Sequence, residues 1–363
     1  MNAEERGKDP VLCRTLLKRL QELLGDRKLR FMEVCGTHTV AIFQSGLARL
    51  LPANLTHLSG PGCPVCVTHD SEVAAFLELA QKPEVILATF GDLLRVPGPE
   101  GQSLKHARAN GCAISIVYSP MEALTLAEAH PEKTVVFLGI GFETTAPTVA
   151  ATLLLARERK LCNFTVLSLH KLVPPVLKAL LDDAACQVDA FLLPGHVSTV
   201  IGLAPYAFLP RDYGVPGVVS GFEPADILLA LCELVKAHKE RTPCVRNAYP
   251  RGVADTGNPR ACALLEQVFE PKDALWRGLG RIAESGLAIR KVFADFDASV
   301  RFDLTLREVK PIAGCRCGDV LKGAITPAKC PLFGKRCTPQ APVGPCMVST
   351  EGSCAAWYKY AGL

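Results

Sequence analysis

The chain has 363 residues, of which 49% are hydrophobic and 21% are charged. These fractions are typical of soluble globular proteins and exclude disordered and fibrous classes. The 40 basic and 36 acidic side chains leave a formal charge of +4, and only 6% of residues are aromatic, which argues against a nucleic-acid-binding protein. Because no apolar run reaches the length of a membrane span and the N-terminus has no signal-peptide pattern, we expect a cytoplasmic protein of two or three domains.

The first predicted element is an amphipathic helix over 11–24, which ends at Gly25. Beyond it, short β-branched and apolar runs alternate with longer helical patterns. The predicted strands cover 30–34, 55–59, 84–90, 113–118, 134–140, 164–169, 189–194 and 217–221. The predicted helices between them cover 70–81, 120–129, 147–159, 173–182 and 225–239. Nearly continuous apolar strands that alternate with helices are typical of parallel sheets covered on both faces.

This alternation predicts an α/β fold with two doubly wound, Rossmann-like parallel-sheet domains. In the expected division, residues 1–29 form the N-terminal helix, 30–147 and 148–243 form the two α/β domains, and 244–363 form a C-terminal domain. That last domain has a helical stretch around 260–292 and a segment rich in Pro, Gly and Cys over 311–347. Because such a segment has few large apolar side chains, covalent links or a metal must hold it together.

Cysteine is frequent in this chain, with 16 residues, and in a reducing compartment these thiols stay free, bind metal or do redox chemistry. Cys35 directly follows a predicted strand, within Glu-Val-Cys-Gly-Thr-His-Thr. Ligands bind at the carboxyl ends of strands in open α/β sheets. A helix that begins near Thr37 would lower the pKa of the Cys35 thiol. The sequence therefore predicts a reactive or metal-binding thiolate here, although a lone cysteine at a turn is often simply buried.

Cys63 and Cys66 form a Cys-x-x-Cys pair within Gly-Pro-Gly-Cys-Pro-Val-Cys, after the next predicted strand. This spacing suits a redox dithiol, half of a zinc site or a soft-metal site. If the two strands are neighbours, three thiols meet at one sheet edge, where iron or zinc is favoured. The polar side chains near these motifs that would tune such a site are His38, His69 and Asp70.

Three further turns follow predicted strands and contain charged or polar residues. They are Gly139–Pro147, Pro194–Ser198 and Gly221–Pro224. Their side chains Glu143, His196 and Glu223 either face a cleft between the sheets or cap helices, and capping is the more common role for the two glutamates. The first turn lacks the third glycine of a dinucleotide fingerprint, and no phosphate-binding loop motif occurs.

Six cysteines lie close together near the C-terminus, in a frame of Pro and Gly. They are Cys315, Cys317, Cys330, Cys337, Cys346 and Cys354. Four thiolates satisfy a [4Fe–4S] cluster and leave two that can form a redox disulfide beside it. Structural zinc with four cysteines is the alternative, but the spacings do not follow the paired layout of common zinc sites.

Taken together, the motifs resemble those of the HypD family of [NiFe]-hydrogenase maturation proteins. The matching segments are Cys-Gly-Thr-His-Thr at 35–39, Gly-Pro-Gly-Cys-Pro-Val-Cys at 60–66, Gly-Phe-Glu-Thr-Thr-Ala-Pro at 141–147, Pro-Gly-His-Val-Ser at 194–198 and Gly-Pro-Cys-Met-Val-Ser at 344–349. The resemblance implies an assembly scaffold with redox activity rather than a conventional turnover enzyme. With a HypC-type partner it would carry an iron that receives two cyanides and one carbon monoxide. The cyanide would come from a HypE–HypF pair, and the finished centre would pass to the hydrogenase large subunit.

By the same resemblance, Cys35 is the essential iron-site thiol, with Cys63 and Cys66 beside it. From their places in the motifs and strand-end turns, His38, Glu143 and His196 are further candidate site residues. The terminal segment is similar to that of ferredoxin–thioredoxin reductase. This similarity implies a [4Fe–4S] cluster on Cys315, Cys330, Cys337 and Cys354, with Cys317 and Cys346 as the redox pair.

Two other functions compete with this interpretation. A [4Fe–4S]-dependent thiol–disulfide oxidoreductase would use Cys63 and Cys66 but leaves Cys35 without a role. A zinc-stabilised interaction module would need only the terminal cysteines. The cysteines outside the motifs are assigned to core or surface positions, and they are Cys13, Cys112, Cys162, Cys186, Cys232, Cys244 and Cys262.

Overall fold

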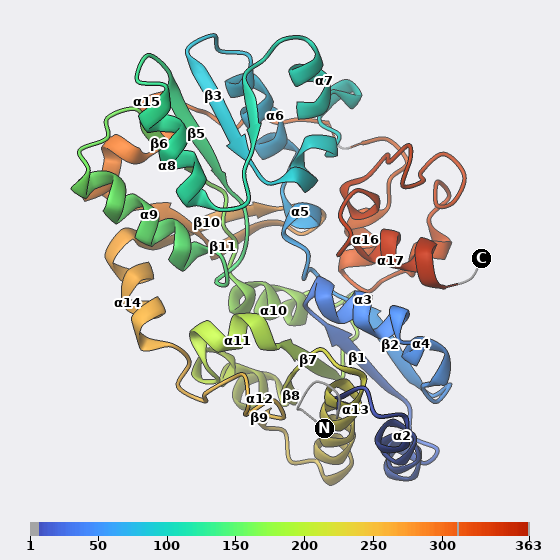
Figure 1. The fold of residues 1–363 in the computed structure, drawn as a ribbon. Coiled ribbons are helices and arrows are strands. Elements are labelled where there is room, and N and C mark those ends of the chain that lie inside the picture. Colours follow the sequence, from blue (N-terminus) through green and yellow to red (C-terminus); the bar gives the residue numbers. More distant parts are fainter. Residues whose placement is uncertain (1–6, 311, 362–363) are drawn as a thin grey trace.

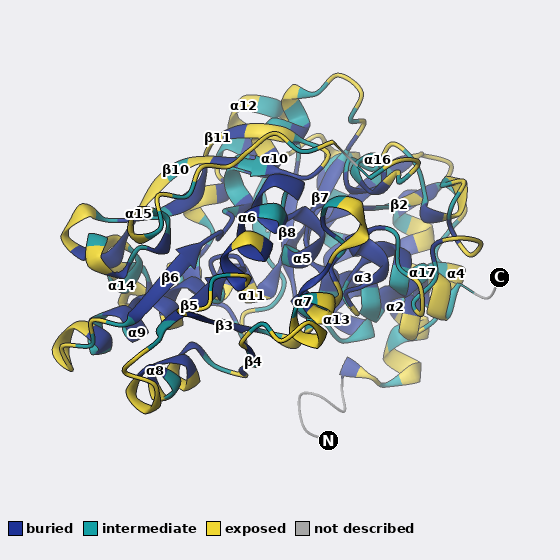
Figure 2. Cartoon of the chain, turned by 90° about the horizontal axis from the view of Figure 1, so that it is seen from above, coloured by how far each residue is buried: buried dark blue, intermediate teal, exposed yellow. Residues whose placement is uncertain are grey.

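A computed structural model describes residues 7–310 and 312–361. Two parallel sheets form its upper and lower halves, and a separate C-terminal lobe lies at the side (Figure 1). Figure 2 shows the strands as mostly buried, with exposed residues concentrated on the outer helices and loops. None of the helices in the described part of the chain is long and apolar enough to cross a membrane. The predicted α/β class with parallel sheets is confirmed.

The first sheet has five parallel strands in the order β2-β1-β7-β8-β9. They are β1 (Leu29–Glu33), β2 (Leu55–Ser59), β7 (Ala190–Pro194), β8 (Gly217–Ser220) and β9 (Val245–Asn247). Helix α2 (Pro10–Leu24) is capped by Asp9, whose carboxylate accepts the Val11 N–H at 2.9 Å. The helix buries Leu20 and Leu24 in one cluster with residues of α13 (Pro224–Glu240). Because helices cover this sheet, β1 and β7 are almost wholly buried, as their apolar sequences predict.

The second sheet has four parallel strands in the order β4-β3-β5-β6. They are β3 (Val85–Thr89), β4 (Ile114–Ile116), β5 (Thr134–Gly139) and β6 (Phe164–Ser168). Each predicted strand up to residue 221 corresponds to one strand of the structure, with ends that differ by at most two residues. The same holds for the helices α6 (Asp70–Ala80), α8 (Pro120–Ala129), α9 (Ala146–Glu158), α10 (Val173–Asp182) and α13.

Shorter helices connect these elements or cap the sheets. They are α3 (Gly36–Gln44), α4 (Leu47–Leu50), α5 (Pro64–Val67), α7 (Leu104–Ala109), α11 (Gly195–Ile201), α12 (Phe208–Tyr213), α14 (Pro259–Val268) and α15 (Ala298–Arg301). The 3₁₀ helices in the two α/β units are η1 (Gly91–Arg95), η2 (Pro99–Gly101), η3 (Ala204–Tyr206) and η4 (Lys291–Phe296).

The order of the strands departs from the expected division at residue 147. Strand β1 pairs with β2 on one side and with β7 on the other, whereas β3 pairs with β4 and β5. The chain therefore starts in the first sheet, builds the whole second sheet after β2, and returns at β7. Because strands that follow one another in sequence need not be neighbours in a sheet, strand prediction alone does not reveal such an excursion.

The expected helical stretch around 260–292 is wrong beyond residue 268. Helix α14 ends there, and β10 (Phe269–Trp276) and β11 (Gly280–Ile289) form an antiparallel hairpin. The turn needs Gly278 and Gly280, which both have positive φ and would break a helix. The hairpin buries Phe269 and Ile289 in one cluster with Phe164 of β6, so tertiary packing overrides the local pattern.

The expected C-terminal domain over 244–363 is likewise divided. Strand β9 belongs to the first sheet, and the hairpin packs on the second. Residues 312–361 form the C-terminal lobe, which contains α16 (Cys317–Leu321), η5 (Pro327–Lys329), η6 (Pro345–Met347) and α17 (Ser353–Tyr360). Helix α17 packs on α3, and η6 packs on α5, so the lobe lies against the turns that follow β1 and β2.

Candidate functional site

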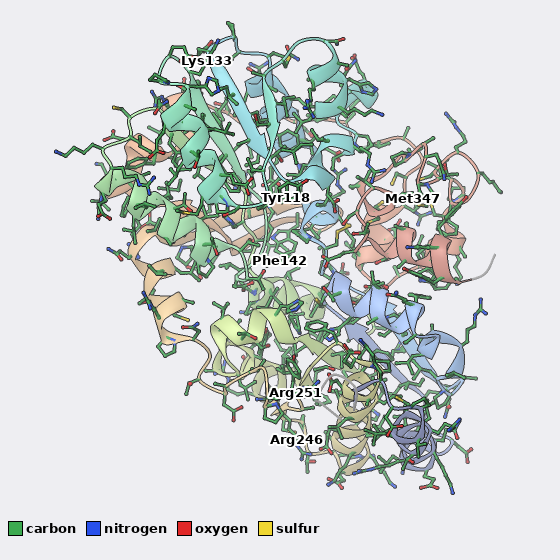
Figure 3. The ribbon with its side chains drawn as sticks, viewed as in Figure 1. Tyr118, Lys133, Phe142, Arg246, Arg251 and Met347 are labelled. Atoms are coloured by element: carbon green, nitrogen blue, oxygen red, sulfur yellow. A yellow bond between two sulfur atoms is a disulfide. The ribbon has the colours of Figure 1, made fainter. Side chains whose placement is uncertain are left out.

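The carboxyl ends of strands from both sheets open into one cleft of about 540 Å³. Its lining residues come from the turns after β1, β2, β3, β4, β5 and β7 and from the C-terminal lobe. Tyr118 and Phe142 of its lining lie between the two halves of the molecule (Figure 3). This is the position at which open parallel sheets bind ligands, and here two such sheets share it.

Cys35 is the cysteine that lines this cleft. It is the residue directly before α3, and its N–H donates a hydrogen bond to the Glu33 carboxylate at 3.0 Å. The hydroxyl of Thr39 donates to the other oxygen of Glu33, so one buried carboxylate holds both sides of the turn. The side chain of Cys35 itself is 9% exposed. The turn therefore presents a nearly buried thiol to the cleft in a fixed orientation.

The pKa of Cys35 differs from the sequence-based expectation. Burial raises the pKa of Cys35 to about 12, and the Glu351 carboxylate adds to the increase. The helix N-terminus does not overcome the loss of solvation, so the expected lowering is wrong for the metal-free protein. A thiol of this kind is neutral by itself, and it becomes a thiolate when a metal ion binds the sulfur.

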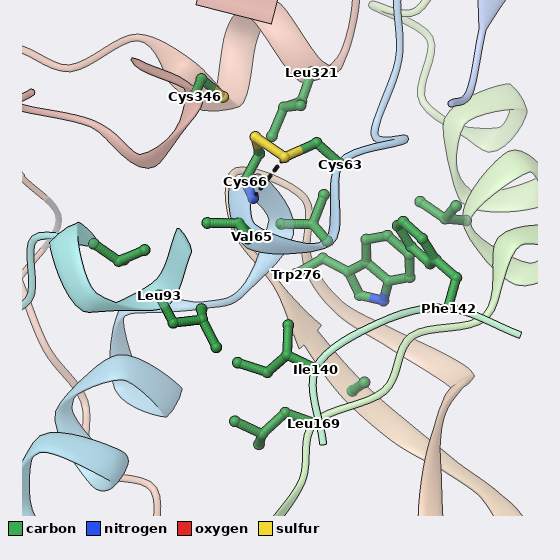
Figure 4. Close-up of a cluster of buried hydrophobic side chains, with 14 of the residues drawn as sticks. Cys63, Val65, Cys66, Leu93, Ile140, Phe142, Leu169, Trp276, Leu321 and Cys346 are labelled. Carbon is green, nitrogen blue, oxygen red and sulfur yellow. Dashed lines mark hydrogen bonds between the residues drawn. A yellow bond between two sulfur atoms is a disulfide. The ribbon is translucent and has the colours of Figure 1, made fainter. Parts of the chain in front are cut away.

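The Cys-x-x-Cys loop adjoins this turn, because β1 and β2 are neighbours as the sequence analysis required. Cys63 and Cys66 form a disulfide at the start of α5. Both are buried, at 3% and 0% exposure, and the residues of this loop that line the cleft are Gly62, Pro64 and Val65. The disulfide faces the C-terminal lobe, and the sulfur of Cys346 points toward it (Figure 4).

The two histidines of the motifs have different surroundings. His38 is fully buried, its Nε2 lies 2.9 Å from the Gly221 carbonyl, and burial lowers its pKa to about 4. Its neutral ring packs on Phe222, at 4.7 Å between centroids. His196 also stacks on Phe222, at 3.9 Å between centroids, and lines the cleft. His196 is therefore available to a ligand in the cleft, whereas His38 supports the wall behind it.

The other polar residues that the motifs contain either cap helices or form a buried ion pair. Glu143 accepts the Val173 N–H at 2.8 Å at the start of α10, and burial raises its pKa to about 7. Glu223 caps α13, and His69 caps α6 through a hydrogen bond from Ser71. Asp70 forms a buried ion pair with Arg277 of the hairpin turn. None of these four motif residues lines the cleft.

The C-terminal lobe brings together thiols that are up to 39 positions apart in sequence. The sulfurs of Cys315 and Cys317 are 3.2 Å apart, and Cys317 also hydrogen bonds with Cys346 and Cys354. The thiol of Cys337 accepts the Val343 N–H at 3.3 Å. A Cβ on Gly344 would overlap the sulfurs of Cys315 and Cys317, so this glycine lets the chain pass over the cysteines.

No group of three or more His, Cys, Asp or Glu side chains within 7–310 and 312–361 is arranged to hold a metal ion directly. The donor set nevertheless fits an iron–sulfur cluster by chemistry, because six thiols lie in one small lobe and Cys317 hydrogen bonds with three of the others. The lobe has few other features that would explain such a concentration of cysteine.

Comparison with known proteins gives the family. A family model described as "HypD: Hydrogenase formation hypA family" matches residues 11–361. The chain belongs to the HypD family. The hydrogenase expression/formation protein HupD of Azotobacter chroococcum mcd 1 is 47% identical over 367 residues, which are 99% of this chain and 97% of that protein. The hydrogenase maturation factor HypD of Escherichia coli (strain K12) is 47% identical over 337 residues, which are 93% and 90% of the two chains.

This HypD-family chain is therefore a hydrogenase maturation factor, and the resemblance of its motifs is confirmed. In this chain, Cys35 and His196 line the cleft. The Cys63–Cys66 disulfide lies at the boundary between the cleft and the C-terminal lobe. Two further residues of the HypD site, Glu33 and Glu351, were not predicted from the sequence. The carboxylate of Glu351 accepts the Thr37 hydroxyl at 2.9 Å and lines the cleft. No spacing in the sequence relates Glu351 to a motif more than 300 positions away.

Proposed function

We propose that this chain is the scaffold on which the iron of [NiFe] hydrogenase acquires two cyanides and one carbon monoxide, with a HypC-type partner and with cyanide from a HypE–HypF pair. The observation that carries the proposal is that Cys35 is the cysteine lining the cleft shared by both sheets. Family membership supports hydrogenase maturation, and the chemistry of this cleft supports an iron atom as the cargo.

Cys35 would provide the first bond to this iron. Thiolates are soft donors, and they suit low-spin iron with cyanide and carbonyl ligands. The walls of the cleft include Val34, Phe142 and Val197, so the cargo would be surrounded largely by apolar groups. The carboxylate of Glu33 holds the Cys35 turn from behind, which keeps the sulfur in place while ligands arrive.

The Cys63–Cys66 pair would act as the switch beside this iron. In the disulfide form neither sulfur is a thiolate, whereas reduction gives two further thiolate donors next to the Cys35 turn. The two turns are already joined, because the Gly36 N–H donates to the Gly62 carbonyl at 3.0 Å. Reduction of the pair would therefore change the donor set at the edge of the cleft without a large movement of the chain.

Electrons for this switch would come from the C-terminal lobe. The Cys317 and Cys346 thiols are hydrogen-bonded to each other, and Cys346 faces the Cys63–Cys66 disulfide (Figure 4). Attack of a Cys346 thiolate on that disulfide and closure onto Cys317 would transfer two electrons and two protons. The products would be a Cys317–Cys346 disulfide and the reduced Cys63 and Cys66 thiols.

A [4Fe–4S] cluster in the lobe would supply single electrons when bound. We assign Cys315, Cys330, Cys337 and Cys354 as its ligands, which leaves Cys317 and Cys346 as the redox dithiol. Two features support this partition. Cys346 lies in η6, which packs on α5, whereas Cys330 and Cys337 lie at the two ends of a separate turn of the lobe.

The test of the proposal is infrared spectroscopy on the anaerobically purified chain, produced together with its maturation partners. The unaltered protein should show iron-bound cyanide and carbonyl bands. Cys35→Ala should lose them and keep its fold and its iron–sulfur absorption. Cys262→Ala is the matched control, because Cys262 lies in α14 and outside the cleft lining. Retention of the bands in Cys35→Ala refutes the assignment of Cys35.

A thiol–disulfide oxidoreductase remains the second candidate, and the disulfide beside Cys346 is the observation in its favour. The burial of Cys63 and Cys66 argues against a protein disulfide as substrate, since neither sulfur is open to a second protein. Turnover of a disulfide substrate by the purified chain, without maturation partners, would support this candidate.

A further inference from the structure

The C-terminal lobe carries the whole charge imbalance of the chain. Residues 312–361 contain six lysines or arginines and two acidic residues, whereas the rest of the chain has 34 of each sign. The net charge of +4 is therefore confined to about one seventh of the sequence. Such an asymmetry creates a local field that attracts partners of opposite charge, and it has little to do with fold stability.

Two of the six cations are neutralised within the protein. Arg316 pairs with Asp319, and Lys322 pairs with Asp183 at 3.1 Å. The other acidic residue of the lobe, Glu351, faces the cleft and accepts a hydrogen bond from Thr37. The outer side of the lobe thus retains four exposed cations that form no ion pair with any residue the structure describes. They are Lys329, Lys335, Arg336 and Lys359.

These four cations lie on elements of the lobe that contact one another, and we call this exposed region the basic face. Lys329 belongs to η5, which packs on α17, and Lys359 is near the end of α17. Lys335 and Arg336 lie in the turn from Phe333 to Cys337, and the Phe333 ring contacts Tyr358 of α17 edge-on at 6.2 Å between centroids. Tyr358 is 37% exposed and directly precedes Lys359 in α17. Tyrosine and arginine are the residues most typical of protein–protein contacts.

Two cysteines of the lobe are sequence neighbours of these cations. Cys330 follows Lys329, and Cys337 follows Arg336. The opposite side of the lobe, with Cys346, packs on the Cys63–Cys66 loop. A carrier bound at the basic face would therefore approach the thiols at one side of the lobe, while the electrons are used at the other.

From this juxtaposition we propose that the basic face of the lobe docks an acidic, low-potential, one-electron transfer protein, which supplies the electrons for the Cys63–Cys66 pair. The inference rests on the redox role proposed above for the lobe. Reduction of the disulfide takes two electrons and two protons, so two carrier molecules would dock in turn and the protons would come from water. Small and transient contacts guided by charge are typical of electron-transfer partners.

The test uses the anaerobically purified full chain and a reduced plant-type [2Fe–2S] ferredoxin as the acidic probe. The readout is the rate at which Cys63 and Cys66 become free thiols, followed by alkylation and mass spectrometry. For the unaltered chain we expect reduction that slows as salt is added. The double variant Lys335→Glu/Arg336→Glu should react about tenfold more slowly or worse at low salt. The matched control, Arg14→Glu/Lys18→Glu on α2, makes the same change in charge at exposed positions elsewhere and should keep the rate.

Dithiothreitol, an uncharged reductant, checks that the disulfide is intact, and it should reduce all the variants equally. The proposed docking surface is wrong if ferredoxin reduces the disulfide at the same rate in the variant and in the unaltered chain. It is also wrong if that rate does not depend on the salt concentration. Displacement of the ferredoxin by transfer RNA, with tight RNA binding at the same face, overturns it as well. If the dithiothreitol-reduced chain assembles no iron–cyanide centre with its partners, the proposed function fails, whatever the ferredoxin does.

Discussion

The N–H of Gly36 donates a hydrogen bond to the carbonyl oxygen of Gly62 at 3.0 Å. This bond joins the turn that carries Cys35 to the loop that carries Cys63 and Cys66. The approach is so close that a Cβ on Gly62 would overlap the backbone of Cys35. The two cysteine motifs of the HypD site are thus two halves of one structural unit, which only glycine at position 62 allows.

Substitution of this glycine should therefore disrupt the cleft. We expect Gly62→Ala to lower the free energy of unfolding by about 1–3 kcal/mol, because the added methyl group must push the Cys35 turn away. Chemical denaturation measures this change. Gly91→Ala is the control, because a Cβ at Gly91 meets only Ile116 at an ordinary 3.9 Å. Equal stability of the two variants would contradict the close approach.

The reactivity of Cys35 in the metal-free protein should respond to its two polar neighbours in opposite directions. The Glu351 carboxylate raises the pKa of Cys35, and the hydrogen bond with Thr37 lowers it. At a fixed alkaline pH below the pKa, Glu351→Gln should alkylate faster at Cys35, since more thiolate is present. Thr37→Val should alkylate more slowly. An unchanged alkylation rate in both variants would show that burial alone controls the thiol.

Glu143 should make the stability of the protein depend on pH. Burial raises the pKa of this carboxyl from 4.5 to about 7, so the folded state holds a proton that the unfolded state releases. The contribution of this group to stability is fully present below about pH 4.5 and is lost as the pH rises through 7. Glu143→Gln should therefore be more stable than the unaltered chain at pH 8, by about 1–3 kcal/mol.

Urea unfolding at pH 5 and pH 8 measures this difference. Glu158→Gln changes an exposed glutamate of α9 and should leave the pH dependence as it is. If Glu143→Gln loses as much unfolding free energy between pH 5 and pH 8 as the unaltered chain does, the Glu143 carboxyl does not cause the pH dependence.

The buried ion pair of Lys171 and Glu72 should contribute to stability only as a pair. Its two side chains are 2% and 5% exposed. Lys171→Met leaves a buried carboxylate without its partner and should cost about 3–5 kcal/mol of unfolding free energy. The double variant Lys171→Met/Glu72→Gln should recover a large part of this loss. Thermal and urea unfolding of the single and double variants measures the difference.

The surface pair of Arg159 and Glu128 serves as the comparison, because its side chains are 44% and 41% exposed. Arg159→Met should cost less than about 1 kcal/mol, since water screens this pair. A similar loss for Lys171→Met and Arg159→Met would mean that burial does not strengthen the inner pair.

Most helices and strands of this fold, and part of the candidate site, could be predicted from the sequence. The strands up to residue 221 were found because they are short apolar runs bounded by turn residues. The hairpin of β10 and β11 was missed, because its burial against Phe164 depends on residues about 100 positions away. The lowered pKa expected for Cys35 was wrong for a related reason: the helix start is local, whereas the burial that raises the pKa comes from the surrounding chain.

The sequence by itself determined the α/β class, the positions of Cys35, Cys63 and Cys66 after strands, and the family, because these follow from local periodicity and motif spacing. Only the tertiary structure decided which strands are neighbours, that β1 lies between β2 and β7, and that Glu351 meets Thr37 at the cleft. It also decided that Cys346 faces the Cys63–Cys66 disulfide. Such contacts join residues hundreds of positions apart, and they form because burial of apolar surface acts on the whole chain and leaves no local pattern.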